Sequence, residues 1–256
     1  MQILLSCAKT MTTQSKVKAP FVSEPLHKED AAIIALHMSQ RSVDELEELL
    51  KVNAKIALEN QQRYQVFHSP DTPELPALLA YTGIVFKRID PQSFDEEDFK
   101  LAQAWLRLTS FAYGLLRPLD VIRNYRLEGT VRLEELGAVT LFDYWKDRLT
   151  SEFIADIKAS GGTLCNLASH EMKQLFHWKE VEKQVRIITP EFKVWKEGKL
   201  KTVVVYAKMC RGEMTRYIIK NSVEDPEELK NFSWDGFNFD PSLSEGDNWV
   251  FVATQK

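Results

Sequence analysis

The 256-residue chain has few of the residues that mark well-known catalytic motifs. Its three cysteines form no C-x-x-C pair, which suits a protein of a reducing cytoplasm. Its ten glycines form neither a G-x-G-x-x-G dinucleotide motif nor a P-loop, and no G-x-S-x-G elbow is present. The sequence therefore carries no standard nucleotide-binding or nucleophile motif.

Long apolar runs are missing as well. No stretch approaches the roughly 20 apolar residues that a membrane span needs, and residues 1–6 lack the basic region of a secretory signal. With 44% apolar and 27% charged residues, the composition is that of a soluble globular protein. We therefore expect a cytoplasmic protein without a membrane partner.

The chain also lacks an overall excess of positive charge, but its charges are unevenly spread. Residues 199–220 hold six cations and one acid, Glu213, whereas residues 224–256 hold eight acids and two cations. The net charge of −4 argues against a protein that coats nucleic acid through bulk charge. It leaves room for a local basic cleft, because the acidic tail hides the basic segment in the total.

Apolar spacing predicts a single domain over residues 1–256, of mixed α/β (α+β) class, with helices packed around a mixed sheet. Ser42 and Glu45 form a capping box that opens one helix. Strands are predicted at residues 3–5, 163–167, 185–188, 192–195 and 202–206, and helices at residues 94–108, 141–157 and 212–221. No internal repeat or linker divides the chain.

Cations recur where these predicted elements end. Lys9 follows the first strand, Lys208 ends the apolar run 202–206, and Arg211 stands in the turn before the next helix. Three more surround Pro118 in an otherwise apolar segment: Arg117, Arg123 and Arg126. Guanidinium and ammonium groups are not buried unpaired, and strand ends and helix N-termini favour phosphate. An anion-binding cleft is the leading hypothesis.

Each of these cations also has a structural interpretation, in which it pairs with an acid close in sequence. The pairs of this kind are Arg117 with Asp120, Arg126 with Glu128, and Arg216 with Glu213. His170 and His177 lie two helical turns apart without a third ligand nearby, so surface or capping histidines are favoured over a metal site. We predict no metal and no cofactor.

Several short sequence motifs are spread over nearly the whole chain. They are SCAKT at residues 6–10, YGLLRPLD at 113–120, YRLE at 125–128, NLAS at 166–169 and YAKMCRGEMTRYII at 206–219. In this order they resemble the blocks S-P-A-K-T, L-x-x-L-R-P-L-D, Y-R-L-E, N-L-A-S and Y-A-K-K-A-R-G-x-M-x-R-F-I-I. These belong to the YaaA family of bacterial peroxide-stress proteins.

The resemblance implies a cytoplasmic protein of the oxidative stress response, linked to lower reactive iron, with a basic cleft that binds duplex DNA. It also implies a helix-hairpin-helix-like element near residues 94–122. Phe111 stands where the family has a hairpin glycine, and Met209 where it has a second lysine. Together with Arg123 from the basic segment, the cleft residues implied are Lys9, Arg117, Tyr125, Arg126, Asn166, Lys208, Arg211 and Arg216.

Three functions compete on these grounds. The first is a stress protein that contacts DNA phosphates without sequence preference and in a salt-dependent way. The alternative is an enzyme for a phosphorylated or nucleoside substrate, in which a desolvated Lys9 or Lys208 is the nucleophile or base and Glu128 carries the proton. Direct iron handling is third, because no cluster of metal ligands stands out.

Overall fold

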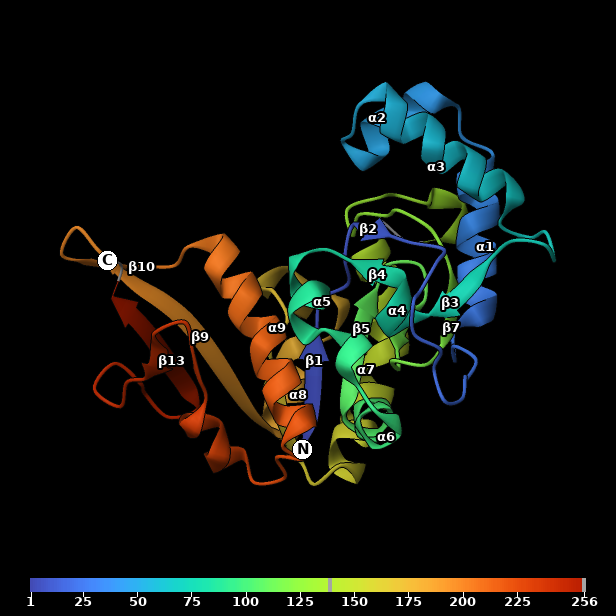
Figure 1. Cartoon of the computed structure of the whole chain (residues 1–256). Coiled ribbons are helices and arrows are strands. Elements are labelled where there is room, and N and C mark those ends of the chain that lie inside the picture. Colours follow the sequence, from blue (N-terminus) through green and yellow to red (C-terminus); the bar gives the residue numbers. More distant parts are fainter. Residues whose placement is uncertain (138–139, 255–256) are drawn as a thin grey trace.

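The computed structural model of the chain describes residues 1–137 and 140–254 (Figure 1). The α-helices are α1 (Lys28–Ser39), α2 (Val43–Leu50), α3 (Ala54–Val66), α4 (Ala77–Ala80), α5 (Ile84–Ile89), α6 (Glu96–Trp105), α7 (Leu141–Ala159), α8 (Trp178–Gln184) and α9 (Val204–Lys220). Short 3-10 helices are η1 (Pro91–Ser93), η2 (Glu134–Leu136), η3 (His170–Leu175) and η4 (Pro226–Asn231). Among these described residues, no helix is both long enough and apolar enough to cross a bilayer.

The strands form one large sheet and two small ones. They are β1 (Gln2–Leu5), β2 (Thr10–Met11), β3 (Glu74–Pro76), β4 (Tyr81–Thr82), β5 (Leu106–Ser110), β6 (Gly114–Leu116), β7 (Val121–Arg123), β8 (Thr163–Asn166), β9 (Arg186–Lys196), β10 (Lys199–Lys201), β11 (Ser233–Trp234), β12 (Phe237–Phe239) and β13 (Asn248–Thr254). Over the described ranges the large sheet has the order β11-β12-β13-β9-β8-β1-β5-β6, with β10 beside β9. The predicted mixed α/β fold is confirmed.

The large sheet has a parallel centre. Strands β13, β9, β8, β1 and β5 pair in parallel, whereas β6 and the outer strands pair antiparallel. The chain runs from β1 to its neighbour β5 and only later adds β8 on the other side of β1. The direction of winding therefore reverses beside β1, which is the position where open α/β sheets bind ligands.

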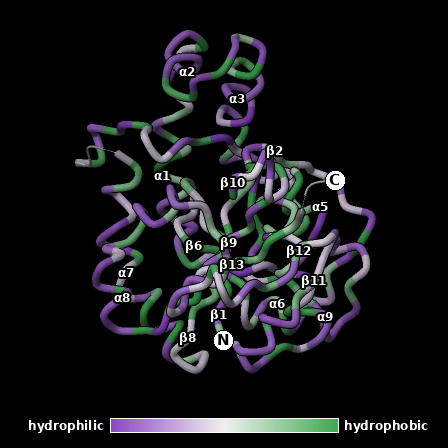
Figure 2. The backbone as a smooth tube through the Cα atoms, turned by 90° about the vertical axis from the view of Figure 1, so that its left-hand side faces the viewer, coloured by the Kyte–Doolittle hydropathy of each residue, from purple (hydrophilic) through white to green (hydrophobic). Residues whose placement is uncertain are grey.

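The central strand β1 is apolar on both faces. Ile3, Leu4 and Leu5 of β1 are at most 1% exposed, as expected for a parallel strand covered on both sides. Helix α7 contacts β6 and β8, while α9 contacts β9, α5 and α6. Figure 2 shows the hydrophobic stretches gathered in the interior and hydrophilic stretches on the outer helices.

Most predicted elements are confirmed. Strands 3–5 and 163–167 correspond to β1 and β8, helix 141–157 to α7, and the capping box at Ser42 to the start of α2. Residues 185–188 and 192–195 belong to one strand, β9. The two predicted segments are continuous because β9 pairs with β13 along all of its outer part.

The predicted strand at residues 202–206 is wrong. Helix α9 begins at Val204, so Lys208 lies inside a helix and does not end a strand. On one side, β9 pairs with β13 over seven residues. On its other side, only the short strand β10, which ends at Lys201, pairs with the outer end of β9. A run of valines matches a buried strand locally, but Val204 is 65% exposed and Val205 is 46% exposed.

The helix-hairpin-helix-like element predicted near residues 94–122 is also wrong. Helix α6 is followed by a β-hairpin, β5 and β6, and no second helix occurs between residues 106 and 122. Parallel pairing with β1 draws β5 into the sheet, where all five of its residues are buried. Phe111 lies buried in the hairpin turn and its carbonyl accepts a hydrogen bond from Trp145 Nε1 at 2.9 Å.

Candidate anion-binding pocket

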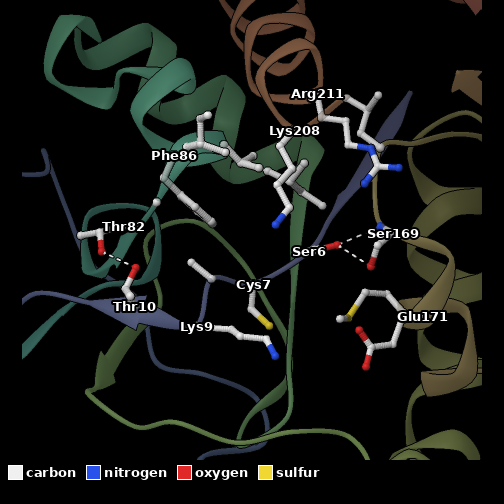
Figure 3. A pocket seen from close by; sticks show the side chains of 17 residues that line it. Ser6, Cys7, Lys9, Thr10, Thr82, Phe86, Ser169, Glu171, Lys208 and Arg211 are labelled. Atoms are coloured by element: carbon white, nitrogen blue, oxygen red, sulfur yellow. Dashed lines mark hydrogen bonds between the residues drawn. The ribbon is translucent and has the colours of Figure 1, made fainter. Parts of the chain in front are cut away.

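A pocket of about 320 Å³ opens at the carboxyl ends of β1 and β8 (Figure 3). One wall is formed by residues 5–10, which follow β1, and another by residues 167–172, which follow β8. Residues 82–86 at the start of α5 and one face of α9 close the remaining sides. The loops after β1 and β8 diverge because the winding reverses there, and this leaves the crevice.

Helix α9 contributes two cations to the pocket. Lys208 and Arg211 are three residues apart, so they lie on the same face of the helix. The prediction that Arg211 stands in a turn before a helix is wrong, because Arg211 lies in the interior of α9. The free backbone N–H groups of a helix N-terminus are therefore not beside it.

Gly212 holds this face of α9 close to α5. A Cβ at residue 212 would overlap the carbonyl oxygen of Val85 and lie 2.6 Å from the Cβ of Arg88. Only glycine allows the two helix backbones to approach this closely. The neighbouring Arg211 is thereby held beside the start of α5, which forms the opposite wall.

Arg211 is the most unusual charge of the pocket. Its side chain is half-buried, and within residues 1–137 and 140–254 its guanidinium has neither a hydrogen-bond partner nor an acid in ion-pair distance. Burial lowers the pKa of Arg211 from its usual value, but an arginine stays charged at neutral pH. A half-buried, unpaired cation is costly, so the site suits a bound anion.

Lys9 enters the pocket from the segment after β1 and is paired with an acid. Its Nζ donates to both carboxylate oxygens of Glu128 at 2.7 Å, and Arg126 Nη2 lies 3.6 Å from the same carboxylate. The Glu128 side chain is 12% exposed and that of Lys9 is 62% exposed. The candidates Lys9 and Glu128 are therefore in contact, but neither Lys9 nor the exposed Lys208 is desolvated as expected.

Two serines and a cysteine lie between these charges. The backbone N–H of Ser169 donates to Ser6 Oγ at 2.8 Å, and Ser6 Oγ–H donates to Ser169 Oγ at 3.3 Å. Burial raises the pKa of the Cys7 thiol to about 12, so the thiol is neutral at physiological pH. Sequence reasoning did not select these residues, although the SCAKT and NLAS blocks contain all three.

The remaining predicted cations are held by protein partners. Arg117 donates to Asp120 Oδ1 through Nε at 3.1 Å and through Nη2 at 2.9 Å, which confirms the structural interpretation of this pair. Arg123 donates to Glu74 Oε1 at 2.9 Å and to the carbonyl of Phe67. These guanidiniums are satisfied without a ligand.

Arg216 is likewise engaged, but not by the predicted acid. It bonds to the carbonyl oxygen of Ile89 at 3.2 Å and lies 3.4 Å from the carboxylate of Asp90. Glu213 instead lies 3.4 Å from Arg88 of α5. The pairing of Arg216 with Glu213 is therefore wrong, because both side chains turn toward neighbouring elements rather than along α9.

The two uncharged residues predicted for the cleft, Tyr125 and Asn166, lie in the protein interior. Tyr125 is 4% exposed, and its hydroxyl lies 2.6 Å from those of Tyr81 and Ser110. Burial raises the pKa of Tyr125 well above its usual value. Asn166 is 2% exposed and its side-chain oxygen accepts from the N–H of Ala168 at 3.2 Å. Both residues support the loops around the pocket and do not line it.

The two histidines are separate surface groups. The His177 ring lies 2.6 Å from Asp147, and His170 is exposed at the start of η3. In the part of the chain that the structure describes, no group of three or more histidine, cysteine, aspartate or glutamate residues could hold a metal ion.

The chain is similar to known bacterial proteins over nearly its whole length. Residues 1–243 match the family model described as peroxide stress protein YaaA. A UPF0246 protein of Bacteroides thetaiotaomicron is 67% identical over 252 residues, which cover 98% of each chain. UPF0246 proteins of Porphyromonas gingivalis, 44% identical over 98% of this chain and 99% of theirs, and of Teredinibacter turnerae, 36% identical over the full length of both, are similar as well.

Proposed function

Since this chain belongs to the bacterial family of the peroxide stress protein YaaA, we propose that it acts in the cytoplasmic response to peroxide by binding a phosphorylated ligand in the pocket beside α9. Family membership supports the further proposal that this activity limits iron-dependent damage. The structural support comes from the charges of the pocket.

The observation that carries the proposal is the unpaired guanidinium of Arg211. A phosphate group satisfies such a guanidinium through two parallel charge-assisted hydrogen bonds. Lys208 on the same face supplies further positive charge, whereas the charge of Lys9 across the pocket is already paired with Glu128. Each charge-assisted bond contributes roughly 1.5–3 kcal/mol, so loss of Arg211 should weaken binding by at least about tenfold.

The pocket favours a small ligand. Its volume of about 320 Å³ lies at the lower end of the roughly 300–1,000 Å³ of small-molecule sites. If the ligand is a substrate, Lys9 is the lining residue that could exchange a proton with it. Glu128 does not line the pocket but accepts hydrogen bonds from Lys9 at 2.7 Å, so it could act only through that lysine.

Duplex DNA is the second candidate ligand. Lys9, 62% exposed, and the exposed Lys208 lie where a backbone phosphate at the rim of the pocket would be within reach. A duplex normally contacts a longer stripe of free cations, whereas Lys9, Arg117, Arg123 and Arg216 are all engaged by acids of the protein itself. The geometry therefore supports the small ligand better.

Calorimetric titration at two salt concentrations tests the proposal, with inorganic pyrophosphate and a 20-base-pair duplex as probes. The proteins are wild type, Arg211→Ala and Lys208→Ala, with Lys55→Ala on the exposed surface of α3 as the control for lost charge. Pyrophosphate binding should be weakened at least about tenfold by Arg211→Ala and be unchanged by Lys55→Ala. If only DNA binds, with a steep dependence on salt, the ligand of this pocket is a duplex and not a small molecule. If neither probe binds, the proposal is wrong.

Lys9→Arg separates binding from chemistry. Arginine keeps the charge but not the capacity of a lysine to act as nucleophile or base. If the pocket only binds, the variant should protect a peroxide-sensitive strain that lacks the endogenous protein as well as wild type does. Loss of protection with unchanged pyrophosphate affinity would show that Lys9 takes part in a reaction.

A further inference from the structure

Glu171 brings a free carboxylate into a pocket of cations. It lies two residues after Ser169 in the segment that follows β8, its side chain is exposed, and it lines the pocket (Figure 3). Over residues 1–137 and 140–254 it has no hydrogen-bond partner and no cation within ion-pair distance. Figure 3 shows its carboxylate on the side of the pocket that also carries Ser169. The pocket thus has two charged poles that are not joined to each other.

Neutral polar groups lie between the two poles. In Figure 3 the hydrogen-bonded Ser6 and Ser169 lie between Arg211 and Glu171. Along this wall the order is therefore guanidinium, hydroxyls, carboxylate. Hydroxyl groups both donate and accept, so they match the hydroxyls of a sugar.

Apart from Lys9, whose charge is paired with Glu128, the opposite wall and the floor are apolar or uncharged. Ala8, Ile84 and Val85 are half-buried hydrophobic side chains that face the same space. The Cys7 thiol is protonated at neutral pH. A flat, weakly polar ring system fits such a surface better than a second charged group does.

We propose that the ligand is a nucleotide whose base presents paired N–H donors, as guanine does, with the phosphate on Lys208 and Arg211 and the base edge on Glu171. This inference rests on the proposed binding of phosphate by Arg211. An ionised carboxylate only accepts hydrogen bonds, and guanine offers its ring N–H and its amino group side by side to the two carboxylate oxygens.

The other common bases fit Glu171 less well. Adenine and cytosine place an acceptor nitrogen next to the amino group, and uracil places carbonyl oxygens on both sides of its N–H, so each brings a lone pair toward the carboxylate. A carboxylate that accepts two hydrogen bonds from one base binds other bases more weakly, because its oxygens are then left without a donor. Guanine should therefore be preferred by at least about tenfold.

Calorimetry with GMP, AMP, UMP and inorganic pyrophosphate tests this assignment. Wild type should bind GMP at least about tenfold more tightly than AMP or UMP. Glu171→Gln should remove the preference and leave pyrophosphate affinity within about twofold, because the carboxylate does not hold the phosphate. Glu48→Gln, which neutralises an exposed glutamate of α2, is the control for the changed net charge.

The outcomes separate this inference from the function on which it rests. Equal affinities for GMP and AMP, or a GMP preference that survives Glu171→Gln, would overturn the role of Glu171 while Arg211-dependent pyrophosphate binding still supported the phosphate site. If neither pyrophosphate nor any nucleotide binds, the phosphate site itself is wrong. A GMP preference that depends on Glu171 and is kept in Glu48→Gln supports both.

Discussion

The arginines after β6 and the two pocket cations of α9, Lys208 and Arg211, are the same kinds of residue in opposite surroundings. Arg117 is bound by the buried carboxylate of Asp120, and Arg123 is bound by Glu74. Lys208 and Arg211, which line the pocket, have no such acid among the described residues. The first group is part of the protein's own polar network, and the second is left for a ligand.

This difference shows that a charged residue in an apolar segment is not by itself a binding residue. Burying a cation costs free energy in either region. After β6 a nearby acid offsets it, and in the pocket a bound anion would offset it. Removing the acid in one region and the cation in the other should therefore affect different properties.

The largest effect is expected at Asp120. Its carboxylate, in a residue 1% exposed, accepts from Ser23 Oγ at 2.6 Å and from the backbone N–H and guanidinium of Arg117. Asp120→Ala should lower the free energy of unfolding in urea by about 3 kcal/mol, because it leaves several donors unpaired. Arg211→Ala, which removes no internal bond, should leave that free energy within about 0.5 kcal/mol. Equal losses in the two variants would erase the distinction between the regions.

Gly212→Ala should have the next largest effect. The added methyl group would overlap the carbonyl oxygen of Val85 and push α9 away from α5. Overpacking costs about 2 kcal/mol and outweighs the gain in helix propensity of about 1 kcal/mol. Unfolding in urea and pyrophosphate affinity should both be reduced, since Arg211 moves with the helix. Met209→Ala on the same helix is the control, and an unchanged affinity in Gly212→Ala would show that this contact does not position Arg211.

A smaller effect concerns pH and another internally paired cation, His27. Hydrogen bonds to Glu152 and Asp30 raise the pKa of His27 above its usual value of 6.5. The protonated form is therefore favoured in the folded state, and its stabilisation is full below pH 6.5 and is lost as pH rises through the folded pKa. Urea unfolding from mildly acidic to mildly alkaline pH should show this decline, and His27→Gln should flatten it. A wild-type profile without decline would contradict the raised pKa.

The smallest effect is expected at Cys7, in the pocket itself. Since burial raises the thiol pKa to about 12, iodoacetamide at pH 8 should alkylate Cys7 in the folded protein far more slowly than in the urea-unfolded protein. Cys7→Ser should change pyrophosphate affinity by no more than about twofold, because a neutral group contributes little to anion binding. Rapid alkylation that a bound anion slows would instead indicate a thiolate in the pocket.

Much of the fold could be predicted from local patterns. The apolar run 3–5, the capping box at Ser42 and the amphipathic stretch 141–157 form the expected elements, because each pattern is satisfied by neighbours a few residues away. The strand predicted at 202–206 and the helix-hairpin-helix-like element predicted near 94–122 are wrong. In both, pairing between distant strands, β9 with β13 and β1 with β5, overrode the local signal.

Part of the candidate site can likewise be predicted from local sequence, and part depends on distant contacts. The order of residues alone shows which segments carry the charges, which family blocks contain them, and that Lys9 directly follows the first strand. Which cations are free depends on the fold. The acids that engage Lys9 and Arg123 are Glu128 and Glu74, 119 and 49 residues away in sequence. Coulomb attraction and desolvation depend on distance in space, so only folding determines which charges are paired and which face the pocket.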